Sequence, residues 1–263
     1  MTELLSRAGA VPSVSPSMRE VPLVENPEVV DFARRLIQRE FDVVIFMTGV
    51  GFRLMLRALE GHVSREQFLA TLGILITIAR GPKPVAAMKE VGLQPTYRVP
   101  EPNTWRDILA TIDEQQVPIA GCRIVVQEYG LPNPDLKLAL TARGGAVTTI
   151  RVYRWEMPED TAPLQLNLRE IAAARIDIVL FTSSQQVVHV LQLARQMGIE
   201  EELRRGFRTV VVGSIGPTTS EILREQGLPV DFEPRHPKMG HLVHEIAARS
   251  AQLLQRKRAH WLQ

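Results

Sequence analysis

The stretch FDVVIFMTGVGFRLML, residues 41–56, has a counterpart in IDIVLFTSSQQVVHVL, residues 176–191, which begins 135 residues later. In both, an aspartate precedes a run of apolar residues, and a turn of small or polar residues leads into a segment with helical spacing. An apolar run of this length predicts a buried strand, and the change of spacing predicts a helix after it. Two such units at a long spacing indicate an internal duplication.

A second pair of segments has the same spacing. GPKPVAAMKEVGL begins at residue 81 and GPTTSEILREQGL at residue 216, again 135 residues later. The helices predicted at Val85–Val91 and Ser220–Gln226 each end at a glycine, Gly92 or Gly227, which suits a left-handed cap. We therefore expect two copies of one α/β unit.

Short apolar runs predict strands that are buried on both faces of a sheet. They alternate with helical segments, and this alternation predicts parallel sheets flanked by helices. The predicted strands are Val43–Phe46, Ile74–Ile78, Ile124–Val126, Ile178–Phe181 and Val210–Val212.

The first copy has no counterpart for one strand of the second copy. Near the N-terminus the spacing becomes 136, because GAV at residue 9 matches GAV at residue 145. The counterpart of Ile124–Val126 would then lie before residue 1. We expect the first copy to lack its opening strand. A start assigned too late explains this better than loss of a strand that is usually central.

Composition excludes several classes of protein. Of the 263 residues, 45% are hydrophobic and 23% charged, which is typical of a soluble globular protein, and a net charge of +2 gives no reason to expect nucleic-acid binding. Cys122, the single cysteine, excludes an intramolecular disulfide and is expected to be buried in a strand. No apolar stretch reaches membrane-spanning length and no signal peptide is evident, so we expect a cytoplasmic protein.

Two repeat-related turns could bind an anion. In GPTT, residues 216–219, the N–H groups of a helix N-terminus and the hydroxyls of Thr218 and Thr219 are suitable donors, although a threonine at this place could also simply cap the helix. The matching turn, Arg80-Gly81-Pro82-Lys83, has cations in place of hydroxyls. Together the turns predict a shared anionic ligand.

The turns after two predicted strands are also candidate ligand sites. Thr48-Gly49 and Thr182-Ser183-Ser184 follow Phe46 and Phe181, and open α/β sheets bind ligands at the carboxyl ends of their strands. Helix capping is the alternative, and both roles can hold together. Glycine would let the backbone approach a carboxylate, with Arg53 as a candidate partner.

The sequence gives weaker support for other catalytic or metal-binding residues. Tyr153 lies in an extended stretch, where a tyrosine is more often packed than catalytic. His236, His241 and His244 straddle a loop and a helix start, and solvated histidines explain them better than a metal site. No local motif suggests a Ser-His-Asp or Cys-His arrangement. We expect no metal.

FTSS at residue 181, VGSIGPTTSEILREQGL at residue 212 and VYRWEMP at residue 152 make the chain resemble uroporphyrinogen-III synthase over about residues 8–250. HPKMGHL at residue 236 and EPNTW at residue 101 resemble the family's segments before the last helix of each half. The GPTT segment is the most specific of these matches.

The resemblance implies an α/β fold with two similar domains, each a parallel sheet flanked by helices. A two-stranded ladder would join them beside an interdomain cleft. Met18–Leu23 and Arg151–Pro158 would be the crossing strands, so residues 1–20 and 156–263 form one domain and 21–155 the other. The repeat alone would divide the chain near residue 120.

The resemblance also implies an activity. The family closes the linear tetrapyrrole hydroxymethylbilane into uroporphyrinogen III, inverting the last ring with loss of water, as a step of haem biosynthesis. It needs no cofactor or metal. We therefore expect a lyase and a monomer, with a small-molecule substrate and no nucleic-acid or membrane partner. The substrate's acetates and propionates suit the two turns and their cations.

Individual residues carry over from the family. Tyr153 matches the linker tyrosine proposed to help the hydroxyl group leave. Ser183 and Thr219 match a serine and a threonine of the family's turns, and Thr48 is the repeat counterpart of the serine. Some members have a threonine where this chain has Pro84, so Arg80 or Lys83 would bind carboxylate there instead. The expected site comprises catalytic Tyr153 and substrate-binding Thr48, Gly49, Arg80, Gly81, Lys83, Ser183, Gly216, Thr218 and Thr219.

Two other classes of protein remain as alternatives. A non-catalytic two-domain protein that binds an acidic small molecule would have the same turns. A signalling receiver array needs an acidic cluster and a phospho-acceptor aspartate at the strand ends. Thr, Gly and Ser occupy those positions here, which argues against a receiver.

Overall fold

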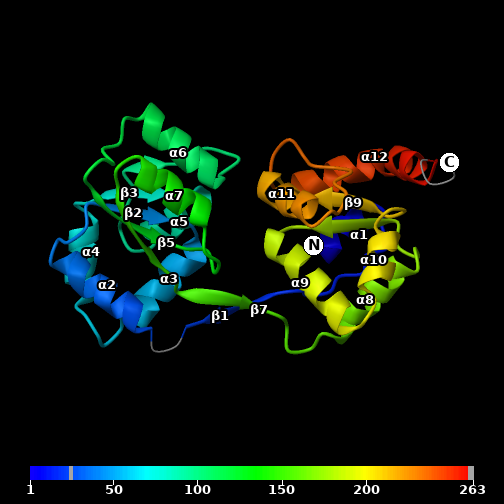
Figure 1. Cartoon of the computed structure of the whole chain (residues 1–263), viewed down its shortest axis with the longest axis horizontal. Helices are drawn as coiled ribbons and strands as arrows, with labels where there is room; N and C mark the ends of the chain where they lie inside the picture. The colour runs from blue at the N-terminus through cyan, green and yellow to red at the C-terminus, as the bar shows by residue number, and fades with distance from the viewer. Residues whose placement is uncertain (24–25, 260–263) are drawn as a thin grey trace. The chain divides into compact units, whose positions relative to one another are not determined.

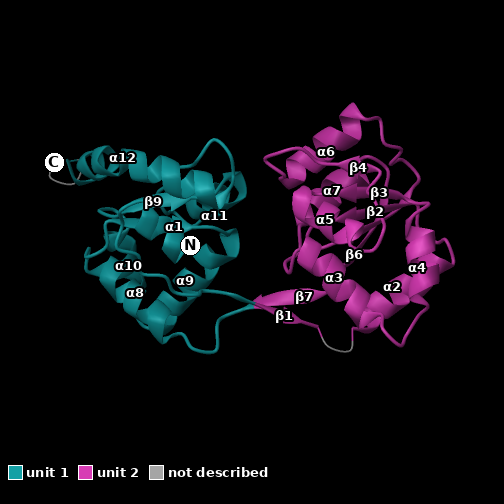
Figure 2. Cartoon of the chain, turned by 180° about the vertical axis from the view of Figure 1, so that it is seen from behind, with its two compact units in different colours: residues 1–19, 156–263 teal, residues 20–155 magenta. Residues whose placement is uncertain are grey.

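The computed structural model describes residues 1–23 and 26–259, and the chain folds as two compact units. Unit 1 comprises Met1–Arg19 and the chain from Glu156 onward, and unit 2 comprises Glu20–Trp155 (Figures 1 and 2). Each unit has its own parallel strands and hydrophobic core.

A two-stranded ladder contains both boundaries between the units. It is formed by β1 (Arg19–Pro22) and β7 (Tyr153–Glu156). Arg19 forms an ion pair with Glu156 at 2.9 Å, and past the other end of β1 the Leu23 N–H donates to the Val152 carbonyl at 3.1 Å. The strands are therefore antiparallel, and the expected ladder is confirmed.

Unit 2 is built on a five-stranded sheet with the order β4-β3-β2-β5-β6, in which all pairs are parallel. Its strands are β2 (Val43–Phe46), β3 (Ile76–Ala79), β4 (Tyr97–Arg98), β5 (Arg123–Gln127) and β6 (Ala146–Ile150). Its helices are α2 (Pro27–Ile37), α3 (Gly49–Ala58), α4 (Arg65–Leu72), α5 (Pro82–Lys89), α6 (Trp105–Glu114) and α7 (Pro134–Ala142).

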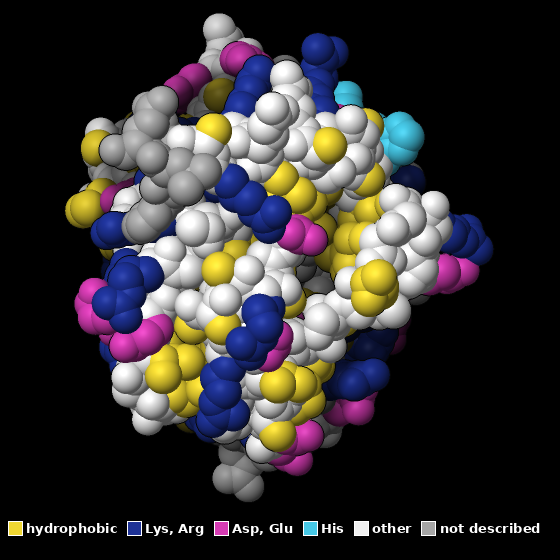
Figure 3. Space-filling view, turned by 90° about the vertical axis from the view of Figure 1, so that its right-hand side faces the viewer, with side chains coloured by type: hydrophobic (Ala, Val, Ile, Leu, Met, Phe, Trp, Pro, Cys, Tyr) yellow, Lys and Arg dark blue, Asp and Glu magenta, His cyan; other side chains and the backbone are white. Residues whose placement is uncertain are grey.

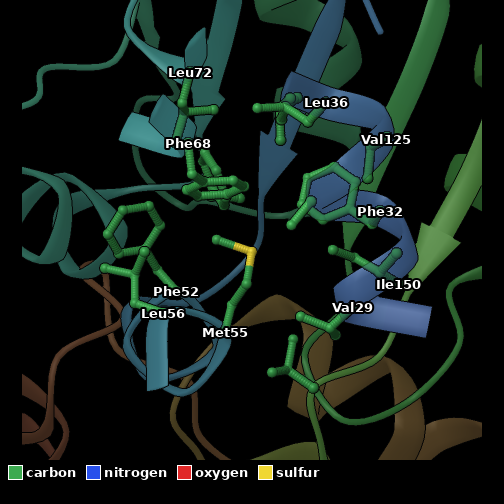
Figure 4. Packing of buried hydrophobic residues seen from close by; sticks show 14 of the residues in the cluster. Val29, Phe32, Leu36, Phe52, Met55, Leu56, Phe68, Leu72, Val125 and Ile150 are labelled. Atoms are coloured by element: carbon green, nitrogen blue, oxygen red, sulfur yellow. The ribbon is translucent and has the colours of Figure 1, made fainter. Parts of the chain in front are cut away.

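The central strand of unit 2 is buried on both faces. Val44 and Phe46 pack into a cluster with residues of α2 to α5, including Phe32, Phe52 and Phe68 (Figure 4). The alternate residues of the strand, Val43 and Ile45, pack with residues of α6 and α7. Because successive side chains of a strand point to opposite faces, this split makes unit 2 a sheet between two helical layers.

Unit 1 has a smaller sheet, in which β8 (Ile178–Phe181) pairs in parallel with β9 (Val211–Ser214). Phe232 adds a single parallel bridge to Gly213. The helices are α1 (Thr2–Arg7), α8 (Ala162–Ala172), α9 (Ser184–Gln196), α10 (Glu200–Gly206), α11 (Pro217–Glu225) and α12 (Met239–Ala259). Val212 packs with α8 to α11 and Val211 with α12, so both faces of β9 are covered.

The α/β fold agrees with the sequence, with three corrections. Ile74 was expected to begin a strand but lies in the turn after α4 and is 65% exposed, so β3 begins at Ile76. Cys122 is only half-buried and precedes β5. Three of the four β8 residues are only partly buried, because in the described residues β8 pairs with β9 alone, whereas β2 pairs on both sides.

Two local predictions are confirmed at the helix ends. Gly92 and Gly227 follow α5 and α11 with φ of +78° and +67°, the left-handed conformation that favours glycine.

Within residues 1–23 and 26–259, no helix combines the length and apolar character needed to cross a membrane. On the face drawn in Figure 3, cationic side chains are interspersed with acidic and uncharged ones.

Candidate functional site

The turn after β2 places a hydroxyl beside a buried phenol. Thr48 is the N-cap of α3, where its Oγ1 accepts the Gly51 N–H at 3.0 Å. The same Oγ1 lies 3.4 Å from the Tyr153 hydroxyl. Thr48 therefore has the capping role that the sequence offered as an alternative, and it also contacts Tyr153, the expected catalytic residue.

Tyr153 has no exposed surface, so the packing role expected for a ladder tyrosine is also present. Its ring lies edge-on to Trp155 with 5.3 Å between centroids, and the Trp155 indole donates to the Tyr129 carbonyl at 2.9 Å. Burial raises the pKa of Tyr153 to about 12, although Thr48 and Arg80 act in the opposite direction. The phenol therefore keeps its proton at neutral pH.

Arg80 directly follows β3, next to the end of β2. Its backbone N–H donates to the Phe46 carbonyl at 3.0 Å, and its Nε donates to the Met47 carbonyl at 3.1 Å. The guanidinium lies over the Tyr129 ring, 5.1 Å from the centroid. Burial lowers the pKa of Arg80, but an arginine remains charged at physiological pH.

Gly81 is required by the turn that holds Arg80. Its φ is +91°, and a Cβ there would overlap the Asn103 side-chain amide. Lys83 follows in the first turn of α5 and is exposed. Its charge acts on Glu20, whose pKa is raised by burial and lowered by Lys83. Two cations thus stand at the start of α5.

Gly49 and Gly51 have structural roles in this region. A Cβ on Gly49 would overlap the Lys83 carbonyl, and one on Gly51 would overlap the Gln127 side-chain amide. Arg53, a candidate carboxylate partner from sequence, instead forms an ion pair with Glu90 at 2.5 Å. The glycines therefore bring α3 close to α5 and to the end of β5.

The expected residues of unit 1 also lie at one sheet edge. Phe181 pairs with Ser214 at the ends of β8 and β9, so the two turns that follow are neighbours. Ser183 is the N-cap residue of α9, and Gly216 that of α11, neither with a side-chain capping bond. Capping by a threonine is therefore wrong for α11: Thr218 and Thr219 lie inside its first turn.

The structure thus brings the expected residues together in two groups. Unit 2 holds Thr48, Gly49, Arg80, Gly81, Lys83 and Tyr153, and unit 1 holds Ser183, Gly216, Thr218 and Thr219. The three histidines do not form a metal site with acidic residues: over the described ranges, no group of three or more His, Cys, Asp or Glu could hold a metal ion.

Several residues around Tyr153 were not found from the sequence. Gly130, with φ of +86°, packs so closely that a Cβ would lie 2.8 Å from both Tyr153 and Trp155. Gln127 is fully buried, and its side-chain oxygen accepts the Thr48 N–H at 3.4 Å. The available signal was the position of Tyr129-Gly130 just after β5, at the carboxyl end of a strand beside β2.

Comparison with known proteins gives a consistent match. The family model of uroporphyrinogen-III synthase HemD matches residues 1–244. An uncharacterized Bacillus subtilis protein, YjjA, is 27% identical, with 94% of this chain and 90% of that protein covered. A putative uroporphyrinogen-III synthase from Methanothermobacter thermautotrophicus is 25% identical, with coverage of 86% and 84%.

A solved structure matches the fold over nearly the whole chain. It is the crystal structure of a mutant uroporphyrinogen III synthase from the extremely thermophilic bacterium Thermus thermophilus, with a TM-score of 0.69 and 26% identity. The match covers 95% of this chain and 93% of that one.

Proposed function

This chain belongs to the uroporphyrinogen-III synthase family, and we propose that it catalyses the reaction for which the family is named. Hydroxymethylbilane would be closed to uroporphyrinogen III with inversion of ring D and loss of water, in the cytoplasm. The observation that carries the proposal is the contact of the buried Tyr153 hydroxyl with Thr48 at the ligand-binding edge of a parallel sheet.

Tyr153 would act as the proton donor to the leaving hydroxyl. When the C–O bond of the hydroxymethyl group breaks, the oxygen needs a proton to depart as water, and the adjacent pyrrole nitrogen can supply electron density to the carbon. A pKa of about 12 keeps the phenol protonated until that moment. Thr48, which also caps α3, holds its Oγ1 3.4 Å from the phenol oxygen, and either hydroxyl can donate in this contact.

The remaining residues would hold the substrate by its carboxylates. In unit 2, Lys83 would present its cation and the one N–H group among the first three residues of α5, because Pro82 and Pro84 have none. In unit 1, the partly exposed Ser183 and Thr218 would present hydroxyls at the N-termini of α9 and α11, where the helix dipole favours an anion, and Thr219 is buried behind them. We propose that each group binds carboxylates of the substrate, and that this binding holds the substrate in the geometry that closes the ring.

The test is the ratio of uroporphyrin isomers. The protein is incubated with hydroxymethylbilane, the product is oxidised, and the type III to type I ratio is compared with that of a protein-free incubation. The proposal predicts an excess of type III that grows with protein concentration. A ratio equal to the protein-free value, together with measurable binding of uroporphyrin III, would instead indicate a non-catalytic binding protein.

A further inference from the structure

Arg80 is placed differently from the ion-paired arginines of unit 2. Arg35, Arg53, Arg123 and Arg143 each contact a carboxylate at the protein surface. Arg80 is partly buried, and in residues 1–23 and 26–259 it forms no ion pair. The titratable groups that act on it electrostatically are two phenols, Tyr129 and Tyr153, and no carboxylate is among them. Because burying a charge without a partner is unfavourable, the site favours an anion supplied by a ligand.

The geometry of Arg80 also suits a carboxylate. One edge of the guanidinium is fixed by the bond from Nε to the Met47 carbonyl, and one face lies over the Tyr129 ring. Neither Nη atom donates a hydrogen bond to the part of the chain that the structure describes. An arginine held in this way presents parallel donors that match the two oxygens of a carboxylate.

The position of Arg80 connects it to the proposed chemistry. Its charge lowers the pKa of Tyr153, against the larger effect of burial, so the two groups share one electrostatic environment. Arg80 and Thr48 both follow paired strands, since Ala79 lies opposite Phe46 in the register of β3 and β2. A carboxylate bound to Arg80 would therefore place its parent ring close to the Tyr153–Thr48 hydroxyl pair.

We propose that Arg80, held by Met47 and stacked on Tyr129, binds an acetate or propionate side chain of the substrate and so positions that pyrrole beside Tyr153. The proposal rests on the proposed function for the identity of the ligand. Tyr129 is a positioning residue in this arrangement, because it acts on the substrate through the guanidinium.

The test uses the whole chain with Arg80→Gln, Arg80→Lys and Tyr129→Leu, and with Arg57→Gln as a control that removes an exposed positive charge from α3. Uroporphyrin III is the binding probe, followed by its fluorescence, and thermal unfolding verifies that each variant folds. We expect Arg80→Gln to weaken binding about tenfold or more. Arg80→Lys keeps the positive charge but loses the two parallel donors of the guanidinium. This variant and Tyr129→Leu should each weaken binding less than Arg80→Gln does. Arg57→Gln should bind like the original protein.

Kinetics with hydroxymethylbilane separate binding from a general structural effect. Arg80→Gln should raise KM by more than it lowers kcat, and Arg80→Lys should recover part of the loss. Unchanged uroporphyrin III affinity and unchanged KM in folded Arg80→Gln would overturn the assignment, even if the protein forms type III isomer. Weakened uroporphyrin III binding in a protein that forms no type III excess would support the Arg80 site and reject the proposed reaction.

Discussion

At the scale of single residues, Tyr153 combines full burial with a hydroxyl contact to Thr48. Tyr153→Phe keeps the ring that packs against Trp155 and removes only the proton donor. We expect turnover of hydroxymethylbilane to fall by about 100-fold, at the low end of what a general acid contributes. The measurement is kcat for Tyr153→Phe and for a control, Tyr97→Phe, which removes a tyrosine hydroxyl from β4. Equal kcat values for Tyr153→Phe and the original protein would reject the role of the phenol as acid.

The pKa of Tyr153 predicts a dependence of stability on pH. With a folded-state value of about 12 against the ordinary 10, the folded chain holds this proton more tightly than the unfolded chain. The resulting stability is fully present below pH 10 and is lost as the pH rises towards 12. It amounts to about 2–3 kcal/mol.

Urea denaturation across this pH window tests the prediction. The free energy of unfolding should fall more steeply for the original protein than for Tyr153→Phe, which lacks the group. Parallel curves for the two proteins would show that burial does not shift the titration of Tyr153.

At the scale of elements, the first turn of α3 depends on its two glycines. Gly49→Ala would overlap the Lys83 carbonyl, a backbone atom that cannot move aside cheaply. We expect the free energy of unfolding to decrease by about 1–3 kcal/mol, despite the better helix propensity of alanine. Gly240→Ala is the matched control, because Gly240 lies in α12 with no atom within 4 Å of the added Cβ. Equal effects of the two substitutions would contradict this close packing.

Local sequence patterns predicted strands at β2, β3, β5, β8 and β9 and the glycines that follow α5 and α11, but not β4, β6 or every neighbour of the site. Val43–Phe46 and Ile178–Phe181 match β2 and β8, because a short apolar run bounded by turn residues has few other stable arrangements. The exposure of β8 depends on which strands lie beside it, and a local pattern does not contain that information.

The site was predicted only in part for the same reason. Thr48, Arg80 and Tyr153 come from three distant segments, and their proximity follows from the order of β3, β2 and the ladder. To predict that Tyr129 and Gly130 belong to the site, one would need to know that β5 pairs with β2. The close packing that requires glycine at position 51 depends on where the Gln127 side chain lies, and only the tertiary structure shows that position.

At the scale of the whole molecule, unit 2 is one continuous segment with its own sheet and two buried clusters. We expect a fragment of residues 20–155 to fold alone, since its core is complete within the segment. Its denaturation should be cooperative and coincide with one transition of the full chain. A fragment without cooperative unfolding would contradict the division into domains proposed from the sequence.

We propose that the whole chain directs ring closure towards the inverted isomer. The most direct measurement is the uroporphyrin III to I ratio formed from hydroxymethylbilane, with the original protein, Tyr153→Phe and a protein-free incubation compared in parallel. We expect predominantly type III with the original protein and a shift towards type I with Tyr153→Phe, because slow catalysis then competes with spontaneous closure. A ratio with the original protein that equals the protein-free value would contradict this proposal.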